Sequence, residues 1–161
     1  MNGSMYQAGN YKPVGLYIEN RKLIHEAHIL NDNSVNFGIN PQAVFFIDTN
    51  NKAGLVRVQQ RNEKKYKYAV QIAPMLLENG QINSALSNFK GKTQRRNGIG
   101  VTANGEIVFI LVPGETTLAG FASLFKQNGC TSAAYIDGFV SDYWTTDTKN
   151  NSRFGVIVKS N

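Results

Sequence analysis

The chain has 161 residues, 42% of them hydrophobic and 17% charged, which is typical of one globular domain with a sizeable core. No apolar run approaches the roughly 20 residues that a membrane-spanning helix needs, so no membrane contact is expected. The net charge of +6 favours an anionic partner, such as a phosphate, a nucleic acid or an acidic glycan, without choosing among them. The single Cys130 excludes an internal disulfide.

Short strands separated by turn signals fill the first half of the chain. Apolar alternation bounded by Asn and Gly predicts strands over residues 14–19, 22–25, 42–48 and 55–59. Asn20 and Arg21 stand in the turn of the first hairpin, and Asn79-Gly80 marks a later turn. Residues 61–72 fit either a basic helix or the approach to a strand.

The second half contains the strongest hairpin signal and the best-marked helix. Residues 98–112 predict a hairpin in which Asn104-Gly105 forms a tight primed turn, a geometry that needs positive φ. Thr117 is the expected N-cap of a helix that ends before Gly129. The apolar face of this helix holds Leu118, Phe121, Ala122 and Phe125, and strands over residues 132–137 and 153–158 follow it. These elements predict an α+β fold: a mixed, largely antiparallel sheet with few helices in a single domain.

Two short patterns suggest a cofactor or a metal, and neither fits its context. Residues 98–103 match a Gly-x-Gly-x-x-Ala dinucleotide motif, but a hairpin follows where that motif needs a helix. His25 and His28 are three residues apart, whereas the zinc protease motif places them four apart on a helix. Cys130 has no patterned partner and is expected to be a small structural residue. The sequence therefore predicts no cofactor and no defined metal cluster, although Asp137 with Asp142 could hold a hard cation through oxygen ligands.

Basic and aromatic residues alternate over residues 64–68, in the letters KKYKY. Such a stretch can follow a phosphate backbone and stack bases, although a solvated face has the same composition. No recognised nucleic-acid-binding motif accompanies it, so a nucleic-acid partner is not favoured.

Four segments in a fixed order resemble the phosphodiester glycosidase domain, and most closely its short bacterial branch. The segments are NGSMY with PVGLYIENRKL after it, QIAPMLLENGQIN (71–83), RRNGIGVTANGEIVFILV (95–112) and AAYIDGFVSDYW (133–144). The resemblance implies one domain over residues 1–161, which begins where the family usually has one or more strands before it. Ala73 and Phe139 stand where the family commonly has glycine, so substrate details are not carried over.

The resemblance implies a hydrolase that cleaves a glycosyl phosphodiester, an anionic small molecule or glycan. Arg96 matches the family's Arg-Asn-Gly motif and is expected to hold the phosphate, because a guanidinium matches phosphate oxygens in pairs. Asp137 is expected at the anomeric carbon, where a carboxylate can stabilise positive charge, attack or activate water. Read without the resemblance, two adjacent arginines fit a solvated rim, and Asp137-Gly138 fits a plain turn.

Five further residues are expected to bind substrate: Asn2, Arg95, Asn97, Gly138 and Ser141. Asp142 fits a second carboxylate less well than a solvated loop residue. Two other functions stay open, namely a module that binds an anionic sugar or nucleotide without turning it over and a basic nucleic-acid-binding protein. The sequence also leaves a homo-oligomer open. The N-terminal letters lack the basic and apolar regions of a signal peptide, so the compartment stays unknown, and the resemblance allows an extracytoplasmic one.

Overall fold

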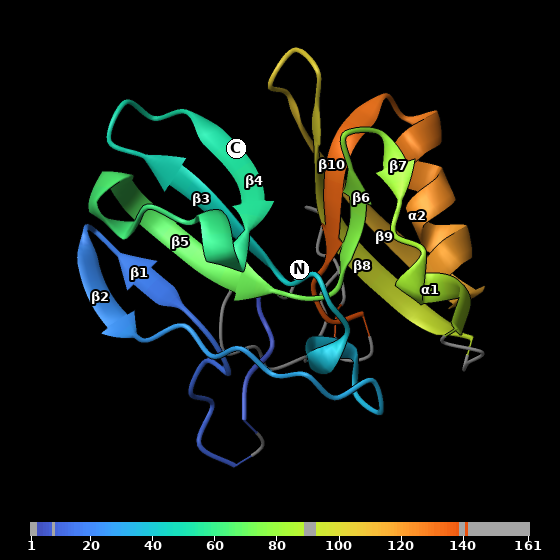
Figure 1. Ribbon diagram of the computed structural model, residues 1–161, viewed down its shortest axis with the longest axis horizontal. Helices are drawn as coiled ribbons and strands as arrows, with labels where there is room; N and C mark the ends of the chain where they lie inside the picture. Colours follow the sequence, from blue (N-terminus) through green and yellow to red (C-terminus); the bar gives the residue numbers. More distant parts are fainter. Residues whose placement is uncertain (1–2, 8, 89–92, 139–140, 142–161) are drawn as a thin grey trace, which may run out of the picture.

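The protein is built from two five-stranded sheets that face each other (Figure 1). This computed structural model describes residues 3–7, 9–88, 93–138 and 141. The predicted strand over residues 153–158 lies outside the described residues. Every strand pair among the described residues is antiparallel, so the expected α+β class is confirmed, with two sheets in place of one.

The first five strands form the N-terminal sheet, in the order β2-β1-β5-β3-β4. Its strands are β1 (Tyr17–Glu19), β2 (Lys22–His25), β3 (Ala43–Asp48), β4 (Ala53–Arg57) and β5 (Tyr66–Ile72). Short 3₁₀ turns lie at Asn36–Gly38, Val58–Gln60 and Glu63–Lys65. The ambiguous stretch of residues 61–72 is therefore a 3₁₀ turn followed by a strand.

The remaining strands form the C-terminal sheet, in the order β7-β6-β10-β8-β9. Its strands are β6 (Met75–Glu78), β7 (Gln81–Ile82), β8 (Gln94–Thr102), β9 (Ile107–Thr116) and β10 (Cys130–Tyr135). Two helices, α1 (Ala85–Asn88) and α2 (Leu118–Gln127), accompany this sheet. Neither helix of the described residues is long and apolar enough to cross a membrane.

Apolar side chains fill the space between the sheets and the space under α2. Ile72 of β5 meets Ile99 of β8 and Ala134 of β10 in the cluster between the sheets, and each is at most 1% exposed. Figure 1 shows α2 on the side of the C-terminal sheet that faces away from the N-terminal sheet. There Phe121 and Phe125 pack edge to face, with ring centroids 5.2 Å apart.

The predicted caps of α2 are confirmed. The Thr117 hydroxyl accepts a hydrogen bond from the Gly120 amide at 3.0 Å, which satisfies one of the free amides of the first turn. Gly129 follows the helix with φ +75°, the left-handed conformation expected of a C-terminal glycine. The four predicted apolar residues are buried.

The turn between β8 and β9 differs from the predicted primed turn. Gly105 has φ +82°, but Asn104 is not left-handed, as a type I′ turn would require. The Thr102 carbonyl accepts from the Gly105 amide, and the Thr102 amide donates to the Glu106 carbonyl. These bonds define a three-residue loop, in which one left-handed glycine closes an ordinary turn.

The glycines of the apparent dinucleotide motif serve packing. A Cβ at Gly98 would lie 2.6 Å from the Ala134 carbonyl oxygen, and one at Gly100 would lie 2.6 Å from the Phe125 ring. Both glycines lie inside β8 and allow α2 and β10 to approach its backbone. The rejection of a phosphate loop at residues 98–103 is thus supported by the fold.

Candidate active site

The start of β8 and the end of β10 lie side by side and bring together two sequence segments some forty residues apart. Tyr135 at the end of β10 pairs with Gly98 of β8. Beyond the strand, the Ile136 amide donates to the Asn97 carbonyl at 3.0 Å, so the pairing continues past Tyr135. Asp137 therefore emerges beside the arginines that precede Asn97.

Asn97 fixes the chain on both sides of Asp137. Its side-chain oxygen accepts from the Asp137 amide at 2.7 Å, and its side-chain nitrogen donates to the Ser141 hydroxyl at 2.9 Å. Because the Asp137 amide can only donate, the orientation of the Asn97 side chain is determined. Asn97 is fully buried, so both bonds are made away from bulk water. The sequence predicted Asn97 as a ligand-binding residue, and its described contacts are those of a positioning residue.

Gly138 lies against the β8 backbone. A Cβ on this residue would lie 2.3 Å from the Arg96 Cα and 2.4 Å from the Arg95 carbonyl oxygen, which leaves room for glycine alone. The Gly138 amide donates to the Tyr135 hydroxyl at 3.0 Å, and its carbonyl accepts from the Ser141 amide at 3.2 Å. The Asp137-Gly138 pair is thus packed against the two arginines.

The two arginines occupy different environments. Arg96 is 1% exposed, its Nε donates to the Thr116 carbonyl at 3.2 Å, and its guanidinium carbon lies 5.2 Å from the centre of the Tyr135 ring. Arg95 is half-buried, and its Nη1 donates to the Ser141 carbonyl at 3.0 Å. Arg96 is therefore a buried cation held by the fold, whereas Arg95 is partly accessible.

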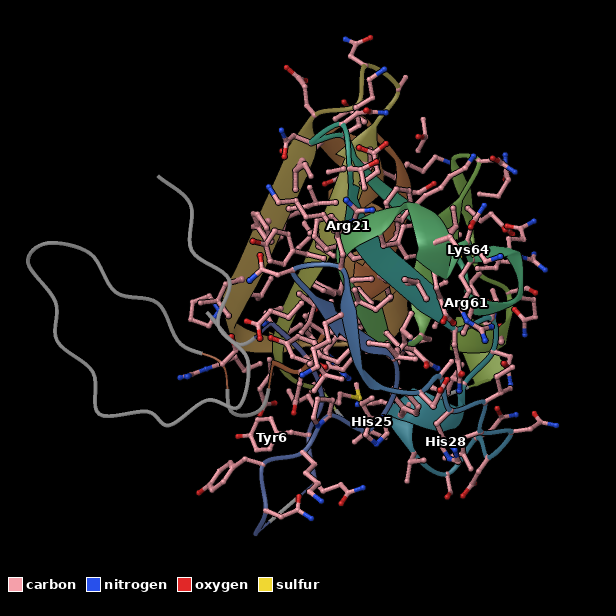
Figure 2. All side chains as sticks on the ribbon, turned by 90° about the vertical axis from the view of Figure 1, so that its left-hand side faces the viewer. Tyr6, Arg21, His25, His28, Arg61 and Lys64 are labelled. Atoms are coloured by element: carbon pink, nitrogen blue, oxygen red, sulfur yellow. The ribbon has the colours of Figure 1, made fainter. Side chains whose placement is uncertain are left out.

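Two phenols lie within the electrostatic reach of the Asp137 carboxylate. Burial raises the pKa of Tyr135, and the negative charge of Asp137 raises it further. Burial is also the first cause of the raised pKa of Tyr6, with Asp137 second. Tyr6 pairs with Pro13 at the base of a loop, and its ring centroid lies 5.6 Å from that of Tyr11. Figure 2 shows Tyr6 low in the molecule, below the strands of the N-terminal sheet.

The structure brings six of the seven predicted site residues together: Arg95, Arg96, Asn97, Asp137, Gly138 and Ser141. Asn2 and Asp142 lie outside the described residues. Sequence reasoning missed Tyr135 and Tyr6 as members of the site. Both lie in segments that carry the family resemblance, Tyr135 in the strand expected over residues 132–137 and Tyr6 at the end of the NGSMY segment. Nothing in their own spacing indicated that they lie within the electrostatic reach of Asp137.

Comparison with known proteins identifies the family. Residues 1–156 match the sequence profile described as phosphodiester glycosidase. The chain belongs to the phosphodiester glycosidase family. It is 35% identical to the protein YigE of Escherichia coli (strain K12) over 143 residues, which cover 88% of this chain and 55% of YigE. The chain thus spans about half the length of this curated relative.

Two solved structures share the fold of this phosphodiester glycosidase domain. One is the catalytic domain of zebrafish N-acetylglucosamine-1-phosphodiester alpha-N-acetylglucosaminidase, auto-inhibited by its pro-peptide. It has a TM-score of 0.64 and 19% identity, with 96% of this chain and 58% of that chain covered. A hypothetical protein from Synechocystis has a TM-score of 0.52 and 13% identity, with 87% of this chain and 45% of that chain covered. At these identities the likeness concerns the fold.

The histidines and the cysteine of this family member lie in ordinary structural positions. The His25 Nδ1 lies 3.1 Å from the Gly15 carbonyl and 2.9 Å from the Glu26 carbonyl. Cys130 is buried, and burial raises the pKa of its thiol, which makes it a poor nucleophile. Among the described residues, no three His, Cys, Asp or Glu side chains gather as a metal site would require.

Proposed function

We propose that this phosphodiester glycosidase domain hydrolyses a glycosyl phosphodiester at its anomeric carbon. The single observation that carries the proposal is the Asp137-Gly138 backbone, which is held by the Asn97 side chain and packed against the backbone of Arg95 and Arg96 at the start of β8. Membership of the family supports the reaction class. The sugar and the group on the other side of the phosphate are left open.

The arginines and Asp137 stabilise charges of opposite sign during the reaction. A water oxygen bonds to the anomeric carbon, the bond from that carbon to the phosphate oxygen breaks, and a phosphomonoester leaves with the electron pair. The water gives up one proton to solvent, so the products are the free sugar and the phosphomonoester. A phosphate ester is a weak base, so its departure needs charge stabilisation more than proton donation. The guanidinium groups supply this stabilisation, with the accessible Arg95 in contact with the phosphate and the buried Arg96 behind it.

Asp137 acts on the sugar side. The anomeric carbon develops positive charge as the phosphate departs, and a nearby carboxylate stabilises this charge, attacks the carbon or activates the water. The raised pKa values of Tyr6 and Tyr135 keep both phenols protonated at neutral pH. The phenols nearest Asp137 therefore stay neutral and do not compete with its carboxylate for the developing positive charge.

The test compares Asp137→Asn with Glu106→Gln, a matched loss of one carboxylate at the exposed loop between β8 and β9. Release of phosphomonoester from sugar-1-phosphodiesters is followed by phosphorus NMR. We expect Asp137→Asn to lower kcat at least about 100-fold, as the loss of a group that acts on the reacting bond does. Glu106→Gln should leave kcat unchanged. A folded Asp137→Asn variant with wild-type kcat would overturn the proposal.

The arginines are tested with Arg95→Ala and Arg96→Lys. The lysine keeps a buried positive charge and so removes the planar fork without leaving an empty, uncharged site. We expect both variants to lower kcat/KM for the diester. If both bind the diester as the wild-type chain does and mass spectrometry detects no product with any of the three chains, the domain is a binding module rather than a hydrolase.

A further inference from the structure

One end of the N-terminal sheet carries a cluster of basic side chains that the proposed reaction does not use. Three segments meet there: the β1–β2 turn, the β3–β4 turn and the start of β5. The Arg21 amide donates to the Lys67 carbonyl at 2.8 Å, and the Thr49 amide donates to the Lys65 carbonyl at 3.0 Å. The basic edge, as we name it, consists of Arg21, Lys22, Lys52, Lys64, Lys65 and Lys67.

The cations of the basic edge are available to a ligand. Five of the six are exposed, and Lys67 is half-buried with its Nζ 3.3 Å from the Asn51 side-chain oxygen. Arg57 pairs with Glu78 and Arg61 pairs with Glu63, and in the part of the chain that the structure describes no member of the edge forms an ion pair. The edge therefore presents solvated charges.

Three carboxylates lie near the six cations of the basic edge, and two of them are held by backbone hydrogen bonds or by an ion pair outside the edge. Asp48 accepts from the Asn50 and Lys52 amides at 2.8 and 2.9 Å, as the turn requires. Glu63 lies 2.6 Å from the Arg61 Nε. Glu19 is the third, and its backbone lies opposite that of Lys22 in the register of β1 and β2. The local excess of positive charge attracts a polyanion.

The aromatic residues of the edge do not form a platform for nucleic-acid bases. Tyr66 is 4% exposed and stacks on Phe46 at 4.4 Å, inside the N-terminal sheet. The Tyr68 hydroxyl donates to the Asn20 side-chain oxygen, and the Lys67 Nζ lies 5.6 Å from the Tyr68 ring. Tyr68 is 37% exposed, so the edge has one accessible ring and not a row of them. Lysine point charges beside a single ring suit phosphates on a backbone better than unpaired bases.

Strand β5 connects the basic edge to the candidate active site. It starts at Tyr66, directly after Lys65, and ends at Ile72. Two residues later the Pro74 carbonyl accepts from the Tyr135 amide at 3.0 Å. Seven residues of strand span roughly 24 Å. Figure 2 shows Arg21 and Lys64 higher in the molecule than Tyr6, which agrees with this separation. A ligand that touches both places must span about this distance, and a chain with several phosphates does so while matching the positive charge of the edge.

We propose that the basic edge binds the distal phosphates of a phosphodiester-linked glycan polymer while one linkage of the same polymer lies at Asp137. This inference rests on the proposed function and specifies its substrate class. Binding at the edge makes the second contact intramolecular, which raises the effective concentration of the linkage at the site.

The test removes charge from the edge and compares it with an equal change elsewhere. Lys64→Gln/Lys65→Gln is paired with Lys126→Glu, which changes the net charge by the same amount at the exposed end of α2. The probes are a polymer of sugars joined through sugar-1-phosphodiester linkages, a single glycosyl phosphodiester, and single-stranded DNA. Binding is measured in the Asp137→Asn background so that no turnover intervenes, and kcat/KM is measured with Asp137 intact.

We expect the edge variant to bind the polymer about tenfold more weakly than Lys126→Glu does. The slope of the logarithm of its binding constant against the logarithm of the salt concentration should be shallower by roughly one to two. The kcat/KM for the single diester should be unchanged. Equal polymer affinity and slope in the two variants would overturn the inference. Tighter binding of DNA than of polymer, lost in the same variant, would overturn the ligand class. Absence of hydrolysis of the single diester by the wild-type chain would refute the proposed function, while the polymer affinities still decide the role of the edge.

Discussion

Replacing Gly138 by alanine tests whether the close packing of the Asp137 segment on β8 places the carboxylate. The added Cβ would lie 2.3 Å from the Arg96 Cα and 2.4 Å from the Arg95 carbonyl oxygen. Both neighbours are backbone atoms of a paired strand, so neither can turn away as a flexible side chain would. To reach an ordinary contact distance of about 3.5 Å, the segment must move by roughly 1 Å.

The displacement has two measurable costs. Overpacking of a buried position typically destabilises a protein by about 1–3 kcal/mol, and we expect Gly138→Ala at the upper end because the clash involves backbone. The same shift weakens the bonds from the Gly138 amide to the Tyr135 hydroxyl and from the Asp137 amide to Asn97. A misplacement of about 1 Å at a reacting group can lower the rate by about 100-fold.

The assay is urea denaturation together with hydrolysis of a sugar-1-phosphodiester. Gly114→Ala is the matched control, because a Cβ there meets nothing within 4 Å and its φ is outside the left-handed region. We expect the control to keep both the unfolding midpoint and kcat. A Gly138→Ala variant with the midpoint and kcat of the control would show that the close approach of Gly138 to β8 does not position Asp137.

Three further predictions concern stability. Gln71→Leu should destabilise the protein by about 2–4 kcal/mol in urea denaturation, because the Gln71 side chain accepts from the buried Leu16 amide and its removal leaves that donor unsatisfied. A decrease in the free energy of unfolding below about 1 kcal/mol would contradict this reasoning. The folded-state pKa of Tyr135 is raised above the usual 10.0, so its contribution to stability is complete below pH 10 and falls as the pH rises above that value. In denaturation measured at several pH values, Tyr135→Phe should therefore lose less free energy of unfolding above pH 10 than the wild-type protein loses. The Arg57 guanidinium lowers the pKa of Glu78 from 4.5, so the contribution of this pair to the free energy of unfolding is present above pH 4.5 and is lost in more acidic solution. Because the pair is partly exposed, Glu78→Gln should lower the free energy of unfolding by at most about 1 kcal/mol at pH 7. A larger loss would refute a surface role for the pair.

Local signals predicted the elements whose geometry depends on neighbours in sequence. The Asn20-Arg21 turn, the Thr117 cap and the left-handed Gly129 follow from backbone preferences within a few residues, and all three are found. The two-sheet arrangement could not be predicted in this way. Apolar alternation shows that a strand buries one face, but it does not show which of two sheets the strand joins.

The buried polar residues of the N-terminal sheet carried no sequence signal at all. Gln42 and Gln71 are both fully buried, and their side chains are joined by a hydrogen bond of 2.9 Å. Gln71 also holds the backbone of His28, through bonds to its amide and its carbonyl. A glutamine in a strand usually indicates a solvent-facing position, and only the assembled sheet supplies the partners that allow it to be buried.

The predicted hairpin ended at Val112, and the continuation of β9 beyond it explains how Arg96 is held. Gln94 pairs with Thr116, whereas Arg96 pairs with Val112, so β9 has two more residues than β8 between these pairs. The extra residues include Pro113, which cannot donate to a ladder and is tolerated at such an irregularity. The detour brings the Thr116 carbonyl to the Arg96 Nε at 3.2 Å, so the buried guanidinium is anchored by backbone outside the regular ladder. Substitutions at Arg96 are therefore expected to affect folding. The proposed phosphate contact is better tested at Arg95, whose Nη1 donates to the Ser141 carbonyl on the Asp137 side of the site.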